Sequence, residues 1–246
     1  MTRCFIIGHP VAHSRSPIIH GHWLAEHGLD GSYERVDVPP GAVAAFLDRI
    51  RSGEFAGGNV TVPNKEAVLP LLDHVGETAR RMGAVNTIWV EDGKLHGDNT
   101  DAFGFLAHLD DRVPGWDART ASALILGAGG AARAVVHGLV SRGVGRIILV
   151  NRSMARAEDL AAEFGAGVEA RGRSEAAALV ATSDLIVNTT SLGMQGQPPL
   201  DLDLAGLRPG TIVDDIVYVP LETALLAEAR ARGGVPVDGL GMLLHQ

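Results

Sequence analysis

The sequence has 246 residues, which is more than one average domain and too few for two large ones, so two modest lobes or one large α/β domain are expected. Apolar residues make up 46% of the chain, and the formal net charge of −8 argues against a nucleic-acid-binding surface or an anionic-membrane surface. The sequence has no run of eighteen apolar residues, and its first residues do not form a signal-peptide core, so we expect a cytoplasmic protein.

The first part of the chain alternates between strand and helix patterns. Lys65 falls at the expected start of one helix, where the helix dipole would disfavour its positive charge and lower its pKa. The expected elements are a strand at 5–7, a helix at 18–28, an edge strand at 33–38, a helix at 42–52, a short strand after the glycine pair at 57–58, a helix from 64 to about 72, a helix at 77–82, and a turn plus strand over 83–90.

Two serines lie in the loop after the first strand, and two functions are open for them. In an extended segment Ser14 and Ser16 point to the same side, where their hydroxyls could bind a carboxylate or hydroxyl of a small ligand. Alternatively, Ser16 caps a helix that has Pro17 in its first position. The residues alone slightly favour the cap.

The turn at 91–94 carries the Asp-Gly hairpin signal, and a polar loop follows it. Asp98, Asn99 and Asp101 are candidate capping or turn residues in this loop. A helix to about residue 109 comes next, and residues 111–118 read as the connection into a second lobe.

The stretch 121–142 predicts a strand, a glycine turn and a helix in direct succession. Gly127-Ala128-Gly129-Gly130-Ala131-Ala132 fits the dinucleotide-binding pattern G-x-G-x-x-G/A. Gly127 would permit the tight turn, Gly129 would let backbone approach a pyrophosphate, and Ala132 would let the helix pack closely on the strand. A glycine-rich turn that only joins a strand to a helix has the same pattern, so the evidence for a bound dinucleotide depends on the segment that follows.

A second buried-type strand at 146–150 ends in Asn151, Arg152 and Ser153, where a dinucleotide fold reads the adenosine ribose. An NAD site usually has an acidic residue there, which bonds the 2′-hydroxyl and would repel a 2′-phosphate. Here the acid is missing and Arg152 is present, with Arg156 one helical turn beyond. The cofactor is therefore predicted to be NADP.

The rest of this lobe repeats the alternation of strand and helix. Thr189 and Thr190 lie in a polar loop after a buried strand, at the strand end that faces the ligand crevice in open α/β sheets. The expected elements are helices at 155–164 and 174–181, strands at 184–188 and 211–217, and a helix at 222–232, with 233–238 leading out of the lobe.

Together these segments resemble the shikimate dehydrogenase family, whose NADP-dependent members reduce 3-dehydroshikimate. The resemblance covers nearly the whole chain. It rests on HSRSP at 13–17, GGNVTVPNKE at 57–66, GAVNT at 83–87, GDNTD at 97–101, GAGGAARA at 127–134, NRS at 151–153, NTTSLGM at 188–194, DIVYVPLETALL at 215–226 and DGLGMLLHQ at 238–246.

The resemblance implies roles for individual residues. Lys65 and Asp101 match the catalytic pair of the family, and Ser14 and Ser16 would hold the substrate carboxylate, which reverses the preference for a helix cap. The ring hydroxyls would be bound by Asn59, Thr61, Asn86, Tyr218 and Gln246. The cofactor would be bound by Gly127, Ala128, Gly129, Gly130, Ala131, Asn151, Arg152, Ser153, Arg156, Thr189, Thr190, Gly239 and Met242.

The implied fold is α/β with two lobes: a substrate domain at 1–103 completed by 239–246, and a Rossmann-like NADP-binding domain at 104–238. The implied partner is a small-molecule substrate, with no nucleic acid, membrane or metal, in a monomer or homodimer. Two departures from the family pattern are Ala102, where glycine is common, and the end of this sequence at Gln246, where relatives continue into a helix.

Two alternatives remain at this point. One is a quinate/shikimate dehydrogenase of broader substrate and cofactor use, although quinate-preferring relatives tend to have threonine at the position of Ser16. The other is a catalytically idle relative that binds NADP or shikimate, which the presence of both Lys65 and Asp101 argues against.

Overall fold

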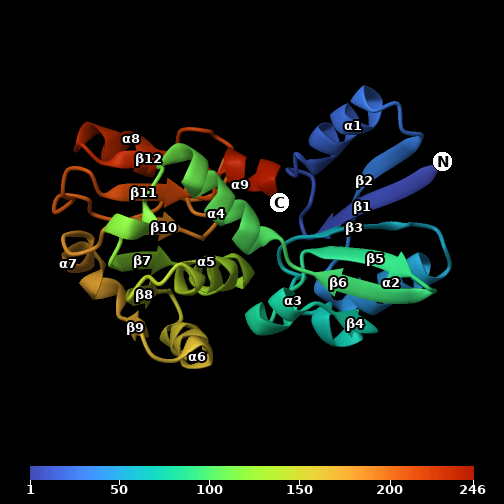
Figure 1. Cartoon of the computed structure of the whole chain (residues 1–246), viewed down its shortest axis with the longest axis horizontal. Coiled ribbons are helices and arrows are strands. Elements are labelled where there is room, and N and C mark those ends of the chain that lie inside the picture. The colour runs from blue at the N-terminus through green and yellow to red at the C-terminus, as the bar shows by residue number, and fades with distance from the viewer. The chain divides into compact units, whose positions relative to one another are not determined.

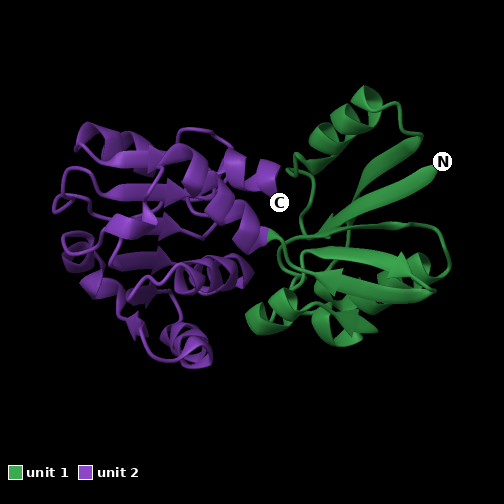
Figure 2. Cartoon of the chain, viewed as in Figure 1, with its two compact units in different colours: residues 1–100 green, residues 101–246 purple.

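The computed structural model describes residues 1–246, and the chain divides into two compact units, residues 1–100 and residues 101–246 (Figure 2). Each unit contains its own six-stranded sheet with helices, as Figure 1 shows by element. The expectation of an α/β protein with two lobes is confirmed.

Unit 1 is built on a mixed sheet with strand order β2-β1-β3-β5-β6-β4. Strands β1, β2 and β3 run parallel, whereas β5 pairs antiparallel with both β3 and β6. The elements are β1 Thr2–Gly8, α1 Ser16–Glu26, β2 Gly31–Asp37, α2 Val43–Arg51, β3 Gly57–Val60, β4 His74–Val75, α3 Glu77–Met82, β5 Thr87–Glu91 and β6 Lys94–Asp98.

A single hydrophobic cluster lies between this sheet and α2. The Phe5 ring on β1 meets the Phe46 ring of α2 edge-on, with ring centroids 4.9 Å apart. It also meets the ring of Phe55, on the approach to β3, with centroids 5.4 Å apart. Edge-to-face contacts are the favoured geometry for aromatic pairs, so the strand and the helix are held in one arrangement.

The expected α-helix from residue 64 to about 72 is wrong. This segment forms turns and a short 3₁₀ helix, Leu69–Leu71, although the Val68 amide donates to the Asn64 carbonyl over 3.1 Å in a single helical turn. Pro70 explains the difference, because proline has no amide hydrogen to donate and its ring clashes with the carbonyl four residues earlier. The segment therefore cannot continue as an α-helix.

Unit 2 has an all-parallel sheet with strand order β12-β11-β10-β7-β8-β9. The first strand of this unit, β7, lies in the middle of the sheet. Strands β8 and β9 extend the sheet on one side of it, and β10, β11 and β12 extend it on the other, which is the Rossmann order. The elements are α4 Asp101–Arg112, β7 Ser122–Leu126, α5 Gly130–Ser141, β8 Arg146–Val150, α6 Met154–Phe164, β9 Val168–Arg171, α7 Ala176–Val180, β10 Leu185–Asn188, β11 Ile212–Asp215, α8 Ala224–Ala231, β12 Val235–Val237 and α9 Leu240–His245.

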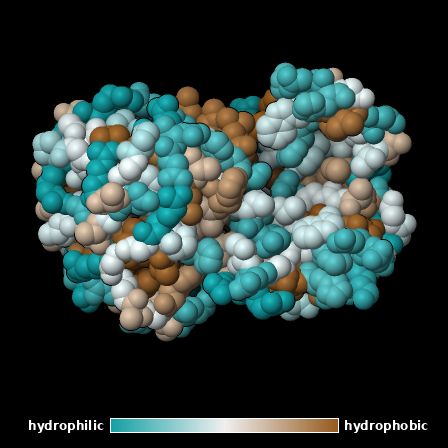
Figure 3. All heavy atoms as spheres, in the orientation of Figure 1, coloured by the Kyte–Doolittle hydropathy of each residue, from teal (hydrophilic) through white to brown (hydrophobic).

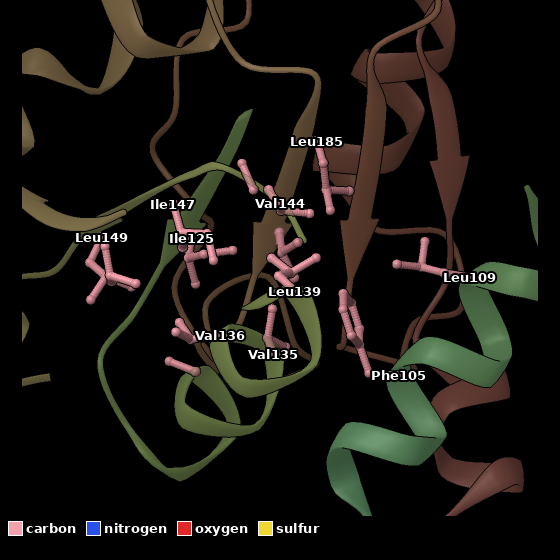
Figure 4. Close-up of a cluster of buried hydrophobic side chains, with 14 of the residues drawn as sticks. Phe105, Leu109, Ile125, Val135, Val136, Leu139, Val144, Ile147, Leu149 and Leu185 are labelled. Atoms are coloured by element: carbon pink, nitrogen blue, oxygen red, sulfur yellow. The ribbon is translucent and has the colours of Figure 1, made fainter. Parts of the chain in front are cut away.

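Both faces of this sheet are covered. Alternate residues of β7 separate into two cores: Ile125 packs with α4, α5 and α6, whereas Leu124 packs with α7 and α8. Figure 4 shows the first of these cores, where Phe105 and Leu109 of α4 and Val135 of α5 point toward the strand residues. Burial on both faces explains why the strands of this unit read as continuous apolar runs.

The division by contacts differs from the expected domain boundaries. All of α4 belongs to unit 2, and so does α9, which packs on α4. By contacts the change of unit comes after Thr100, so residues 111–118, which were expected to connect the lobes, lie within unit 2. Strands β9 and β12 were not expected, because β9 interrupts its apolar residues with charges and β12 contains a proline, a pattern typical of the sheet edges that both strands occupy.

No helix of the structure combines the length and apolar character that a membrane span requires. On the faces that Figure 3 shows, polar residues surround scattered apolar ones in each unit.

Candidate active site

The glycine turn between β7 and α5 has the geometry that the motif predicts. Gly127 adopts φ +117°, and a Cβ on it would lie 2.5 Å from the Thr189 hydroxyl oxygen, so no other residue fits without strain. A Cβ on Gly129 would meet no atom within 4 Å, because that side of the backbone is open. Ala132 is fully buried where α5 passes over the sheet. The tight turn at Gly127 and the close packing at Ala132 are therefore as expected, and the open backbone at Gly129 leaves room for a ligand.

A pocket of about 390 Å³ lies beside this turn, where the strand order of unit 2 reverses between β7 and β10. Nucleotides bind at this switch point in open α/β sheets. Its walls come from the carboxyl ends of β7 and β8, from the loop after β10, and from the segments at 173–176 and 200–202. The lining residues are Leu126, Gly127, Val150, Asn151, Arg152, Arg173, Ala176, Thr190, Ser191, Leu192, Leu200, Asp201 and Leu202.

Arg152 lines this pocket, is exposed, and takes part in no hydrogen bond or ion pair within the chain. Asn151 beside it donates from Nδ2 to the Ser153 carbonyl over 2.9 Å, which fixes the bend that leads into α6. Arg156 lies one turn further along α6 and is exposed. The guanidinium of Arg152 is therefore available to an anionic ligand, which fits a 2′-phosphate.

The loop that carries Thr189 and Thr190 is held by a buried carboxylate. Asp215 at the end of β11 accepts from Asn188 Nδ2 over 2.9 Å and from the Thr223 hydroxyl over 2.7 Å. Asn188 Oδ1 in turn accepts from the Thr190 hydroxyl over 2.7 Å. Burial raises the pKa of Asp215, and these donors act against that rise. Asp215 was not predicted from sequence as a functional residue, because its contact with Asn188 is formed only by the pairing of β10 with β11.

Ser14 and Ser16 are both buried, and their hydroxyl oxygens lie 3.3 Å apart in unit 1. Ser16 is the first residue of α1 and makes no capping hydrogen bond, so the helix-cap alternative is wrong. Arg35 donates to the Ser14 carbonyl from Nε over 2.9 Å and fixes the loop on the sheet. The paired hydroxyls can thus bind two oxygens of one ligand.

A polar network on the sheet of unit 1 orients the two candidate asparagines. The Tyr33 hydroxyl donates to Asn59 Oδ1, and Asn59 Nδ2 donates to the Thr87 hydroxyl over 3.2 Å. Asn86 donates from Nδ2 to the Thr100 hydroxyl over 3.0 Å and accepts at Oδ1 from the Thr100 amide. Burial raises the pKa of Tyr33, which keeps its hydroxyl a donor. Tyr33, Thr87 and Thr100 were not predicted from sequence.

Lys65 and Thr61 lie on the segment that follows β3, and both are half-buried. The Thr61 amide donates to the Ile7 carbonyl over 2.8 Å, which fixes the segment on β1. Because no helix begins at Lys65, the expected influence of a helix dipole on it is also wrong. Asp101 is fully buried at the first position of α4 in unit 2.

The remaining candidates lie at the end of unit 2. Met242 on α9 belongs to the buried core, Tyr218 follows β11 and is half-buried, and Gln246 ends the chain in an exposed position beside Gly104 of α4. Gly239 lies against the residue that follows β11, since a Cβ on it would be 2.2 Å from the Ile216 carbonyl oxygen. The close approach of the Ile216 backbone leaves no room for a side chain at position 239.

Residues 6–88 match the model of the shikimate dehydrogenase substrate binding domain, and residues 110–194 match that of shikimate/quinate 5-dehydrogenase. Shikimate dehydrogenase (NADP(+)) of Azorhizobium caulinodans is 54% identical over 246 residues, which cover 100% of this chain and 88% of that protein. The chain belongs to the shikimate dehydrogenase family.

Solved structures of the shikimate dehydrogenase family and its neighbours agree with this. The Thermus thermophilus shikimate 5-dehydrogenase in complex with NADP(H) and shikimate matches with a TM-score of 0.85 and 40% identity, covering 99% of this chain and 89% of that one. The quinate dehydrogenase of Corynebacterium glutamicum in complex with NAD matches with a TM-score of 0.89 and 33% identity, covering 99% and 90%.

Proposed function

We propose that this chain is an NADP-dependent shikimate dehydrogenase that interconverts 3-dehydroshikimate and shikimate, as an oxidoreductase of aromatic amino-acid biosynthesis. The observation that carries the proposal is the identity of 54% over the full chain to a relative named for that activity. The open backbone at Gly129 and the unpaired Arg152 support NADP, because they suit a pyrophosphate and a 2′-phosphate.

The proposed substrate site uses side chains that are already oriented. Ser14 and Ser16 would bind the carboxylate through two hydroxyls. Asn59, Thr61 and Asn86 of unit 1, with Tyr218 and Gln246 of unit 2, would bind the ring hydroxyls. The Tyr33 hydroxyl fixes the orientation of the Asn59 amide by donating to Oδ1, which keeps a second lone pair that could accept from a substrate hydroxyl.

The bound cofactor would supply the hydride, and the protein would supply the proton and the charge stabilisation. Hydride addition to a ketone leaves negative charge on oxygen, which a nearby ammonium stabilises and then protonates. Lys65 would provide this ammonium, and Asp101 would orient Lys65 and accept from a substrate hydroxyl. This assignment needs the ligand-bound enzyme to bring the two side chains to the same ligand.

The Lys65 assignment is tested by Lys65→Ala. We expect a fall in kcat by two or more orders of magnitude, roughly the contribution of a positioned acid–base group, with a modest change in substrate affinity. Lys94→Ala is the matched control, since Lys94 is the only other lysine of the chain and lies exposed on the hairpin. Near-normal turnover of Lys65→Ala would remove Lys65 from the mechanism.

The likeness to a quinate dehydrogenase with bound NAD favours one second candidate, a broader quinate/shikimate dehydrogenase. Quinate carries an extra hydroxyl beside its carboxylate, so Ser16 would lie near the difference. Initial rates on shikimate and quinate, each with NADP and NAD, decide between the two. We expect the highest kcat/KM for shikimate with NADP; equal values for quinate would support the broader activity, and binding without turnover would support an idle relative.

A further inference from the structure

A second arginine lines the same pocket as Arg152 and comes from a different part of unit 2. Arg173 opens the 3₁₀ turn Arg173–Glu175 that joins β9 to α7, and its side chain is 58% exposed. Nothing in the glycine motif or in the segment at 151–153 indicates it, because it lies about twenty residues further along the chain.

Arg173 is the arginine of its segment that faces the pocket. Arg171, two residues earlier, does not line the pocket and donates to Glu169 Oε2 over 2.6 Å. Glu175, two residues later, accepts from the Gly172 amide over 2.9 Å and stabilises the turn. The turn therefore presents the Arg173 guanidinium to the pocket and holds its acidic neighbour elsewhere.

Asp201 also lines the pocket, and it is the acidic residue there. Its Oδ2 lies 3.4 Å from Arg173 Nη2, and the two side chains are 92% and 58% exposed. An exposed ion pair of this kind contributes little, about 0–1 kcal/mol, so Arg173 can leave Asp201 at small cost. A phosphate dianion is a stronger acceptor than one carboxylate and would compete well for the guanidinium.

We propose that Arg173 is a cofactor-specificity residue that binds the 2′-phosphate of NADP together with Arg152, and that Asp201 opposes this binding. The inference rests on the proposed NADP-dependent function and adds to it. A carboxylate in an adenosine pocket favours a ribose 2′-hydroxyl and repels a 2′-phosphate. Arg173 thus acts twice: it neutralises Asp201 and offers donors to the phosphate.

The test uses 2′,5′-ADP and 5′-AMP, which occupy the adenosine pocket alone, with binding measured by titration calorimetry on the full chain. For Arg173→Ala we expect 2′,5′-ADP to bind about tenfold or more weakly, the value of one charge-assisted hydrogen bond, with 5′-AMP little changed. Asp201→Asn should bind 2′,5′-ADP more tightly than wild type. Arg173→Lys should retain part of the preference, and Arg171→Ala should retain all of it.

The double variant Arg173→Ala with Asp201→Asn separates the two actions of Arg173. We expect binding of 2′,5′-ADP to stay weaker than in Asp201→Asn; full recovery would mean that Arg173 only neutralises Asp201, and the assigned phosphate contact would be overturned.

The outcomes distinguish this inference from the function on which it rests. If wild type prefers 2′,5′-ADP and Arg173→Ala keeps the whole preference while its thermal melt is unchanged, the role of Arg173 is wrong and the NADP assignment stands. If wild type binds both ligands equally, the NADP assignment fails, and the role of Arg173 fails with it.

Discussion

At the scale of single residues, two glycines of one turn differ in whether the protein itself requires them. Gly127 is constrained by the protein itself: its φ of +117° and its approach to Thr189 exclude a side chain. Gly129 is not, since its φ of −105° suits any residue and its open side has room. Only a ligand would make Gly129 necessary.

This contrast gives a prediction for Gly127→Ala and Gly129→Ala. Gly127→Ala should lower the free energy of unfolding by about 1–3 kcal/mol, the usual cost of a strained backbone, as measured by urea denaturation. Gly129→Ala should leave stability near wild type and weaken NADP binding by on the order of tenfold, because a methyl group would stand where the pyrophosphate approaches. NADP binding at wild-type strength in Gly129→Ala would contradict the cofactor position inferred from the turn.

At the scale of elements, the packing of α9 on α4 depends on two glycines that face the opposite helix. A Cβ on Gly104 would lie 2.6 Å from the Met242 carbonyl oxygen, and one on Gly241 would lie 1.8 Å from His108 Nδ1. His108 Nε2 bonds to the Asp238 carbonyl over 2.8 Å, and burial lowers the pKa of His108. The two helices therefore act as one piece, with Met242 in the core.

The domain boundaries can be tested with two fragments. A fragment of residues 101–246 keeps both cores of unit 2 and every pocket residue, so we expect a cooperative thermal melt and binding of 2′,5′-ADP close to that of the full chain. The fragment 104–238 follows the boundaries expected from sequence and lacks Met242 and α9. It should be less stable by roughly 2–5 kcal/mol, the cost of removing a large buried side chain.

Circular dichroism melts of the two fragments give the comparison. Equal stability would mean that α9 contributes nothing to unit 2 and would favour its assignment to the first lobe. An unfolded 101–246 fragment would mean that unit 2 needs unit 1 in order to fold.

At the scale of the whole molecule, much of the fold was predictable because two signals agree with each other. Doubly covered parallel strands require unbroken apolar runs, as at 123–126 and 147–150, and glycine turns mark their ends. The predicted hairpin at 91–94 is confirmed: Asp92 and Gly93 both have positive φ, as the Asp-Gly turn requires.

The features that could not be predicted from sequence depend on tertiary contacts, or lie where two local sequence signals disagree. At 64–72 the conflict is Pro70, which cannot take part in an α-helix that continues to Leu72. Tyr33, Asp215 and Arg173 give no local signal, since each acts on residues brought near by the fold. The candidate catalytic and substrate residues came from family motifs, and their roles stay predictions.

The pocket of unit 2 is lined mostly by residues in turns and loops, whereas the two cores lie in strands and helices. Arg152, Arg173 and Asp201 are the charged residues that line this pocket and are proposed to set its preference, and none of them belongs to a core. A lineage could therefore exchange one nicotinamide coenzyme for the other by a few loop substitutions without remaking the scaffold, and redesign of coenzyme choice should begin at these three positions.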